Sequence, residues 1–145
     1  MVESSALRGL KKDCLLTGFA RLVDEERQNT AMLVAYIAEI DRRKLYLEHA
    51  CSSMFVFCTK RFGMSEAVAH RRIRAGRTTS RFPGVLGMIA RGELHLTAVH
   101  HLAAHLTEEN QEEVLQRAKH RSTREIEELV AEIAPKPDVP SKIRA

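Results

Sequence analysis

Hydrophobic residues recur at steps of three and four along most of the chain, a spacing that places them on one face of a helix. The pattern is longest near the N-terminus, where an apolar stripe extends from Leu15 to Ile40. Gly18 and the polar residues 24–30 interrupt this stripe. Residues 5–44 are therefore predicted to form either one long helix or two collinear helices, separated by a kink or a short loop.

Residues that commonly cap helices divide the rest of the chain. Ser52 or Ser53 can begin a helix over 54–62 that ends at Gly63, and Ser65 can begin the next, over 66–80. Further helices are predicted at 83–92, from 95 or 97 to 106, at 108–120 and, after a capping box, to about 134. No segment alternates with a period of two. The sequence thus predicts an all-α, multi-helix orthogonal bundle with a central helix-turn-helix and a long N-terminal helix.

Three segments follow from this pattern. Residues 1–44 form an N-terminal helical segment that is predicted to dimerise, because so long a helix cannot bury its stripe on a small domain alone. Packing within one chain is the alternative. Residues 45–134 form the helix-turn-helix domain, and the prolines in residues 135–145 indicate an extended tail or linker.

Positive charge is concentrated in one short stretch, from Lys60 to Arg81. These 22 residues contain seven Lys or Arg and a single acid, a net charge of +6, whereas the whole chain carries +4. The remaining residues therefore sum to −2. Such a local excess of positive charge is typical of a surface that binds a polyanion.

The same stretch contains the elements of a major-groove reader: an apolar support helix, a turn with Gly63, and a polar helix that starts at a capping serine. One stripe of the second helix is suited to packing on the support helix, and the opposite arc of about 120° is basic. The packing stripe consists of Ala69, Ile73, Gly76 and Ser80. The residues predicted to contact DNA are Lys60, Arg61, Ser65, Glu66, His70, Arg71, Arg74, Arg77, Thr78 and Arg81.

Position suggests different roles within this set. Ser65, Glu66 and His70 lie where a recognition helix approaches base edges. Arg71 or Arg74 can read guanine through a bidentate fork or contact phosphate, and the remaining cations are predicted to contact phosphates alone. Arg72 lies toward the flank, where an internal acid could pair with it. An arginine-rich helix can equally be a solvated face or a partner for internal acids. The chain supplies such acids at Glu108, Glu109, Glu112, Glu113, Glu125, Glu127, Glu128 and Glu132.

Catalytic and metal-binding patterns are weak. His101 and His105 are four residues apart and share a helix face, but no third ligand follows at a recognisable spacing. Cys51 and Cys58 are interpreted as small core residues. We expect no enzyme activity, no metal and no cofactor. An odd count of three cysteines favours a reduced, cytoplasmic protein, and the longest apolar run, 31–38, is too short to span a membrane.

Two resemblances point the same way. The stretch 53–83, followed by Arg91-Gly-Glu-Leu-His-Leu96 and Ser122-Thr-Arg-Glu-Ile-Glu-Glu-Leu-Val130, resembles the central DNA-binding domain of ParB-type partition proteins. In that family a serine stands where this chain has His95, and the His-Ala-Arg that usually follows is missing here. No nucleotide-binding motif of the family occurs.

A second resemblance covers nearly all the chain from Leu15 onward. The matching motifs are Ile40-Asp-Arg-Arg-Lys-Leu-Tyr-Leu47, Gly63-Met-Ser-Glu66, His70-Arg-Arg-Ile-Arg74, Arg81-Phe-Pro83, Gly92-Glu-Leu-His-Leu96, His105-Leu-Thr-Glu-Glu-Asn110 and Pro135-Lys-Pro-Asp-Val-Pro140. They resemble the N-terminal domain of bacterial HNH endonuclease-like proteins. The resemblance implies a DNA-targeting or assembly domain without the HNH catalytic module.

Together these observations predict a non-catalytic protein that binds double-stranded DNA, as a regulator or as the targeting domain of a nuclease system. One helix-turn-helix gives limited specificity, so a homodimer reading two half-sites about 34–36 Å apart is expected. The alternative is a protein-interaction or dimerisation module that docks a nuclease or another effector without contacting DNA. No membrane partner is expected.

Overall fold

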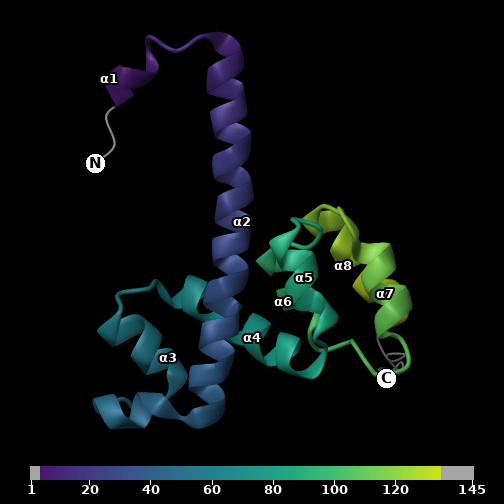
Figure 1. The fold of residues 1–145 in the computed structure, drawn as a ribbon. Coiled ribbons are helices and arrows are strands. Elements are labelled where there is room, and N and C mark those ends of the chain that lie inside the picture. The colour runs from purple at the N-terminus through teal and green to yellow at the C-terminus, as the bar shows by residue number, and fades with distance from the viewer. Residues whose placement is uncertain (1–3, 135–145) are drawn as a thin grey trace, which may run out of the picture.

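The computed structural model describes residues 4–134, and all regular structure in this range is helical, which confirms the predicted all-α class (Figure 1). The elements are α1 (Ser4–Leu7), α2 (Lys12–Arg43), the 3-10 helix η1 (Leu45–His49), α3 (Met54–Val56), the π-helical turn η2 (Phe57–Arg61), α4 (Glu66–Arg81), α5 (Gly84–Ala90), α6 (Leu96–Leu102), α7 (Gln111–Ala118) and α8 (Thr123–Ile133). The predicted tail, 135–145, lies outside the described residues. Among residues 4–134, no helix is both long and apolar enough to cross a membrane.

Helix α2 is the longest element, and it is continuous. Its 32 residues span about 48 Å at 1.5 Å per residue. Neither Gly18 nor the polar residues 24–30 break it, so the predicted kink or loop is absent there. The predicted start near residue 5 is wrong, because the short helix α1 and residues 8–11 precede α2, which begins at Lys12. The helix ends at Arg43, and its C-cap Lys44 has a left-handed backbone (φ 55°) and donates its N–H to the carbonyl of Asp41.

Two hydrophobic clusters form the core, and α4 contributes to both. The larger cluster joins α2 to α5, α6, α7 and α8, and it includes Ala75 of α4. The smaller one joins the C-terminal part of α2 to the segment 51–58 and to Ala69 and Ile73 of α4. Figure 1 shows α4 crossing α2 between the two groups of helices. At this crossing a Cβ on Gly76 would lie 3.3 Å from the backbone nitrogen of Ala38, so the glycine permits the close approach.

The N-terminal part of α2 carries apolar side chains that the rest of the molecule leaves exposed. In Figure 1 this part of the helix projects beyond the other elements. Leu15, Leu16, Phe19 and Leu22 are 43–67% exposed, whereas Ala31, Val34 and Ile37 farther along are buried. Because these buried residues belong to both core clusters, the C-terminal half of α2 shares its core with the rest of the fold.

Several predicted caps are present. The hydroxyl oxygens of Ser53 and Ser65 accept hydrogen bonds from the N–H groups of Val56 (3.1 Å) and Val68 (3.2 Å). Ser122 and Glu125 form the predicted capping box. His95, one of two predicted starts for the next helix, caps α6 by accepting from the N–H of Ala98 at 3.1 Å.

Two helices differ from the prediction because side chains compete for backbone groups. The predicted helix 54–62 is α-helical only to Val56 and continues as η2, where the Thr59 hydroxyl donates to the carbonyl of Phe55 at 2.8 Å. The predicted helix 108–120 begins only at Gln111. Thr107 and Asn110 exchange two hydrogen bonds between side chains and backbone N–H groups, which closes a local turn before the helix.

Candidate nucleic-acid interface

A tight turn places α4 against the segment that precedes it. Gly63 has the left-handed backbone (φ 70°) that favours glycine, and its N–H donates to the carbonyl of Thr59 at 3.1 Å. The N–H of Met64 donates to the carbonyl of Cys58, also at 3.1 Å. Ser65 then caps α4, and Lys60 and Arg61 lie exposed at the end of η2 beside the turn. The local order of helical segment, turn and helix is therefore the one that the sequence predicted.

Helix α4 has a buried face and a basic exposed face. Ala69, Ile73 and Gly76 of the predicted packing stripe are buried, whereas Ser80 is exposed and donates its hydroxyl hydrogen to the carbonyl of Gly76. Of the predicted contacts on α4 and at its N-cap, Ser65, Glu66, His70, Arg71, Arg77 and Arg81 are exposed and Arg74 is half-buried. The ring of His70 stacks on that of Phe55 with centroids 4.5 Å apart, which fixes the imidazole at the surface.

Thr78 is the one predicted DNA contact that the structure buries, although it lines a pocket between α4 and α6. Its side chain is buried, with 6% exposure, and its hydroxyl donates to the carbonyl of Arg74 at 2.8 Å. Helix α4 packs on α5 and α6 as well as on α2, so its buried surface is wider than the stripe read from the sequence. That wider surface encloses Thr78.

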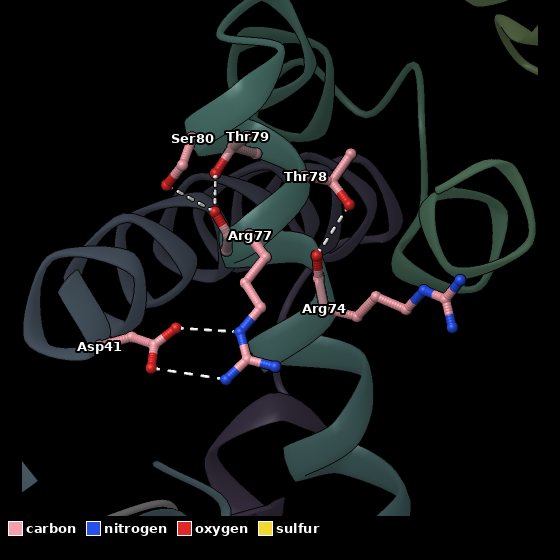
Figure 2. A network of polar contacts seen from close by, with 7 residues as sticks. Asp41, Arg74, Arg77, Thr78, Thr79 and Ser80 are labelled. Carbon is pink, nitrogen blue, oxygen red and sulfur yellow. Dashed lines mark hydrogen bonds and ion pairs between the residues drawn. The ribbon is translucent and has the colours of Figure 1, made fainter. Parts of the chain in front are cut away.

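Arg77 is the one cation of the predicted set whose guanidinium is held by an internal carboxylate among residues 4–134. Its Nε lies 3.0 Å from Oδ2 of Asp41 on α2, and its Nη2 lies 3.5 Å from Oδ1. The hydrogen bond to Asp41 raises the pKa of Arg77. Figure 2 shows the Arg77 side chain turned toward Asp41, and the Arg74 side chain extending away from it. The Arg77 side chain is still 66% exposed.

The other predicted cations have no carboxylate partner in the part of the chain that the structure describes. Within residues 4–134, no carboxylate lies within 4.0 Å of a side-chain nitrogen of Lys60, Arg61, Arg71, Arg74 or Arg81. Arg72, predicted to meet an internal acid, instead donates to the sulfur of Met64 at 3.6 Å.

The four acids of α8, which the sequence offered among the alternative partners, are engaged elsewhere. The other four acids, Glu108, Glu109, Glu112 and Glu113, form no ion pair with a predicted contact in the described range. Glu125, Glu128 and Glu132 pair with Arg121, Arg124 and Arg117, and Glu127 lies 3.7 Å from His101. Internal neutralisation, the alternative raised by the sequence, therefore applies to Arg77 alone among the predicted contacts.

A pocket of about 500 Å³ opens between α4 and α6. Its lining includes His70, Arg74, Arg77, Arg81, Phe82 and His100, and it contains no carboxylate. Burial, and then the positive charge of Arg74, lowers the pKa of His100. Nδ1 of that ring is buried without a hydrogen-bond partner in the described part of the chain. Sequence reasoning did not find His100 as a site residue, because only the packing of α6 on α4 brings it to the basic face.

The remaining candidates for chemistry have structural explanations. In the described range, no group of three His, Cys, Asp or Glu side chains is arranged to hold a metal ion. Cys51 and Cys58 are 7% and 2% exposed, which confirms their interpretation as small core residues, and burial raises the pKa of the Cys58 thiol.

Comparisons with protein families, curated proteins and solved structures find no match to this chain. The resemblances to ParB-type domains and to HNH-associated proteins therefore stay predictions.

Proposed function

We propose that this protein binds duplex DNA without catalysis, and that α4 is the recognition helix of a helix-turn-helix. The observation that carries the proposal is the uncompensated charge of α4. Within residues 4–134, Arg71, Arg74 and Arg81 have no carboxylate partner, while the four acids of α8 pair with other cations or lie beside His101. Like charges so close together repel one another in the free protein. Phosphate binding removes that repulsion and releases counterions from the duplex.

Within this proposal, the start of α4 approaches the bases and its flanks hold the backbone. Ser65, Glu66 and His70 are exposed on the first turns of α4, where recognition helices reach base edges. Lys60 and Arg61, beside the turn, and Arg81, at the far end of the helix, are placed to contact phosphates on either side. Arg77 contributes less, because Asp41 already neutralises much of its charge.

The first test is a fluorescence-anisotropy titration of a duplex at several salt concentrations. We expect affinity to fall steeply between roughly 50 and 200 mM salt, because each phosphate contact contributes about −0.9 to the slope of log K against log salt. The double variant Arg71→Ala/Arg74→Ala should bind more weakly and reduce the magnitude of that slope by about 2.

A matched control separates local contacts from net charge. Arg124→Ala/Arg21→Ala removes two cations from exposed positions on α8 and α2, where each pairs with a glutamate one turn away. This control should keep the slope of the parent protein. Weak duplex affinity at low salt that the α4 double variant leaves unchanged would contradict the proposal.

The apolar part of α2 favours a second candidate, a module that docks a nuclease or another effector. Exposed side chains such as Phe19 and Leu22 resemble the core of a protein-binding surface. This function predicts that substitutions on α2 abolish partner binding, and that the α4 variants leave it intact. The two functions are compatible if α2 assembles the protein and α4 contacts DNA.

A further inference from the structure

We propose that the pocket between α4 and α6 binds a phosphate group, with Arg74 and Arg81 supplying charge and His100 a neutral N–H donor. Where the phosphate belongs to a duplex backbone, this inference rests on the proposed function. The pocket itself does not depend on DNA, because a free phosphate ester has the same chemistry. The two sources are separated by experiment.

The pocket is lined by one stripe of α4. His70, Arg74, Arg77 and Arg81 follow one another at steps of three or four residues, and α6 forms the opposite wall with His100. Charge-assisted hydrogen bonds from guanidinium to phosphate are short and strong, and the planar fork matches two phosphate oxygens. The stripe therefore places several hydrogen-bond donors along one wall of the pocket.

Part of the pocket lining is apolar, and one ring in it orients one of the donors. Ile73, Phe82 and Ala103 line the cavity together with Thr78. The guanidinium carbon of Arg81 lies 4.8 Å from the centroid of the Phe82 ring, a cation–π contact that restricts the side chain before any ligand arrives. Apolar neighbours also lower the local dielectric, which strengthens the attraction between Arg81 and an anion. Because Asp41 holds Arg77 at the edge, Arg74 and Arg81 are the available charges.

His100 adds a donor of a different kind. Its Nδ1 is buried without a partner, so a proton there would have no acceptor. Burial, and then the positive charge of Arg74, lower the pKa of the ring, which favours neutral imidazole. Neutral imidazole carries one proton, and because a proton on the buried Nδ1 would be a donor without an acceptor, we assign it to Nε2. His100 can therefore donate one hydrogen bond to a phosphate oxygen and add no charge.

This assignment makes a distinctive prediction for duplex binding. His100→Ala should weaken affinity about three- to ten-fold, the effect of one hydrogen bond, and leave the salt slope unchanged because no charge is lost. Arg74→Ala should weaken affinity and also reduce the magnitude of the slope by about 1. His100→Gln keeps a side-chain N–H donor and should recover much of the loss. His105→Ala, on a histidine outside the pocket lining, is the matched control and should bind as the parent protein does.

The second experiment uses inorganic phosphate and requires no DNA. Phosphate at millimolar concentration should shift the ring resonances of His100 in an NMR titration that saturates, and Arg81→Gln should weaken the effect. If adding a duplex suppresses this titration, the phosphate group that occupies the pocket comes from the DNA backbone. If the duplex binds elsewhere and the titration persists, the ligand is a free phosphate ester.

The duplex and phosphate experiments also distinguish the proposed DNA-binding function from the proposed phosphate pocket. A parent protein that binds no duplex but shows the saturable shift overturns the proposed function and supports the pocket. Duplex binding that His100→Ala leaves unchanged, together with no His100 shift in phosphate, overturns the pocket and leaves the proposed function standing.

Discussion

At the scale of single residues, similar cations on α4 have different surroundings. Arg77 lies one turn beyond Arg74, and Asp41 captures it from a helix 36 residues earlier in the chain. Arg74 lies on the α6 side and has no such partner in the described range. The sequence identified both as basic residues for DNA contact but did not predict the internal partner of Arg77, because that carboxylate is brought close only by the crossing of α2 and α4. Packing of α4 on α5 and α6 contributes to the burial of Thr78, and packing of α6 on α4 brings His100 to the basic face.

His100 also makes stability depend on pH. Its pKa in the folded protein lies below the value of about 6.5 expected in the unfolded chain. As pH falls below about 6.5, the unfolded chain therefore takes up a proton that the folded protein resists, and folding stability decreases. His100→Gln should lose less stability than the parent protein between pH 7.5 and 5.5, measured by urea unfolding.

Between pH 7.5 and 5.5, the effect of histidines on stability can be separated from the effect of the ion-paired carboxylates. Hydrogen bonds from Arg42 and Arg43 lower the pKa of Glu39 to about 2, so the stability from that carboxylate is lost only below its usual value of 4.5. A His100→Gln protein whose unfolding midpoint falls with acid as steeply as that of the parent would contradict the assignment. His105→Gln serves as the matched control.

At the scale of elements, the sequence predicted what local rules decide. The start of α4 at Ser65, the Gly63 turn and the Ser122–Glu125 capping box depend on residues within one or two turns, and all are present. The π-helical turn after α3 and the late start of α7 were not predicted. In both places a side chain bonds to nearby backbone, and this competition depends on rotamers that a hydrophobic pattern does not encode.

Two glycines in helices should respond to substitution in opposite directions. Gly76 faces the backbone of Ala38 at the crossing of α2 and α4, whereas a Cβ on Gly18 would meet nothing within 4 Å. Gly76→Val should destabilise the protein by about 1–3 kcal/mol through overpacking. Gly18→Ala should stabilise it by about 0.5–1 kcal/mol, because alanine loses less backbone freedom on folding. Denaturant unfolding of both variants checks this, and equal effects would show that α2 and α4 are less closely packed.

At the scale of the whole molecule, the fold separates a basic face from an apolar arm. We define the arm as residues 12–26 of α2. The C-terminal half of that helix joins the two hydrophobic clusters, so the position of α4 is fixed by the same element that carries the arm. The long helix and its stripe were predictable from periodicity. Which half of α2 is buried was not predictable, because that depends on where α4 and α5 pack against it.

The exposed arm predicts self-association. Isolated helices are marginal in water, and an exposed stripe containing Leu15, Phe19 and Leu22 is covered most simply by the arm of a second copy. We expect sedimentation velocity to show a dimer at micromolar concentration. Leu15→Glu/Phe19→Glu should shift the protein to monomer and weaken duplex binding through loss of one half-site. The buffer should contain a reductant, because the exposed thiol of Cys14 could otherwise link copies covalently.

A matched variant tests whether the apolar stripe itself is responsible. Thr17 and Gln28 are exposed on α2, and at 100° per residue they lie roughly opposite Leu15. Thr17→Glu/Gln28→Glu adds the same charge to α2 and should remain dimeric. A parent protein that stays monomeric at high concentration would exclude association through the arm. Dissociation of both variants alike would show that charge on α2, and not loss of the apolar contact, is what separates the subunits.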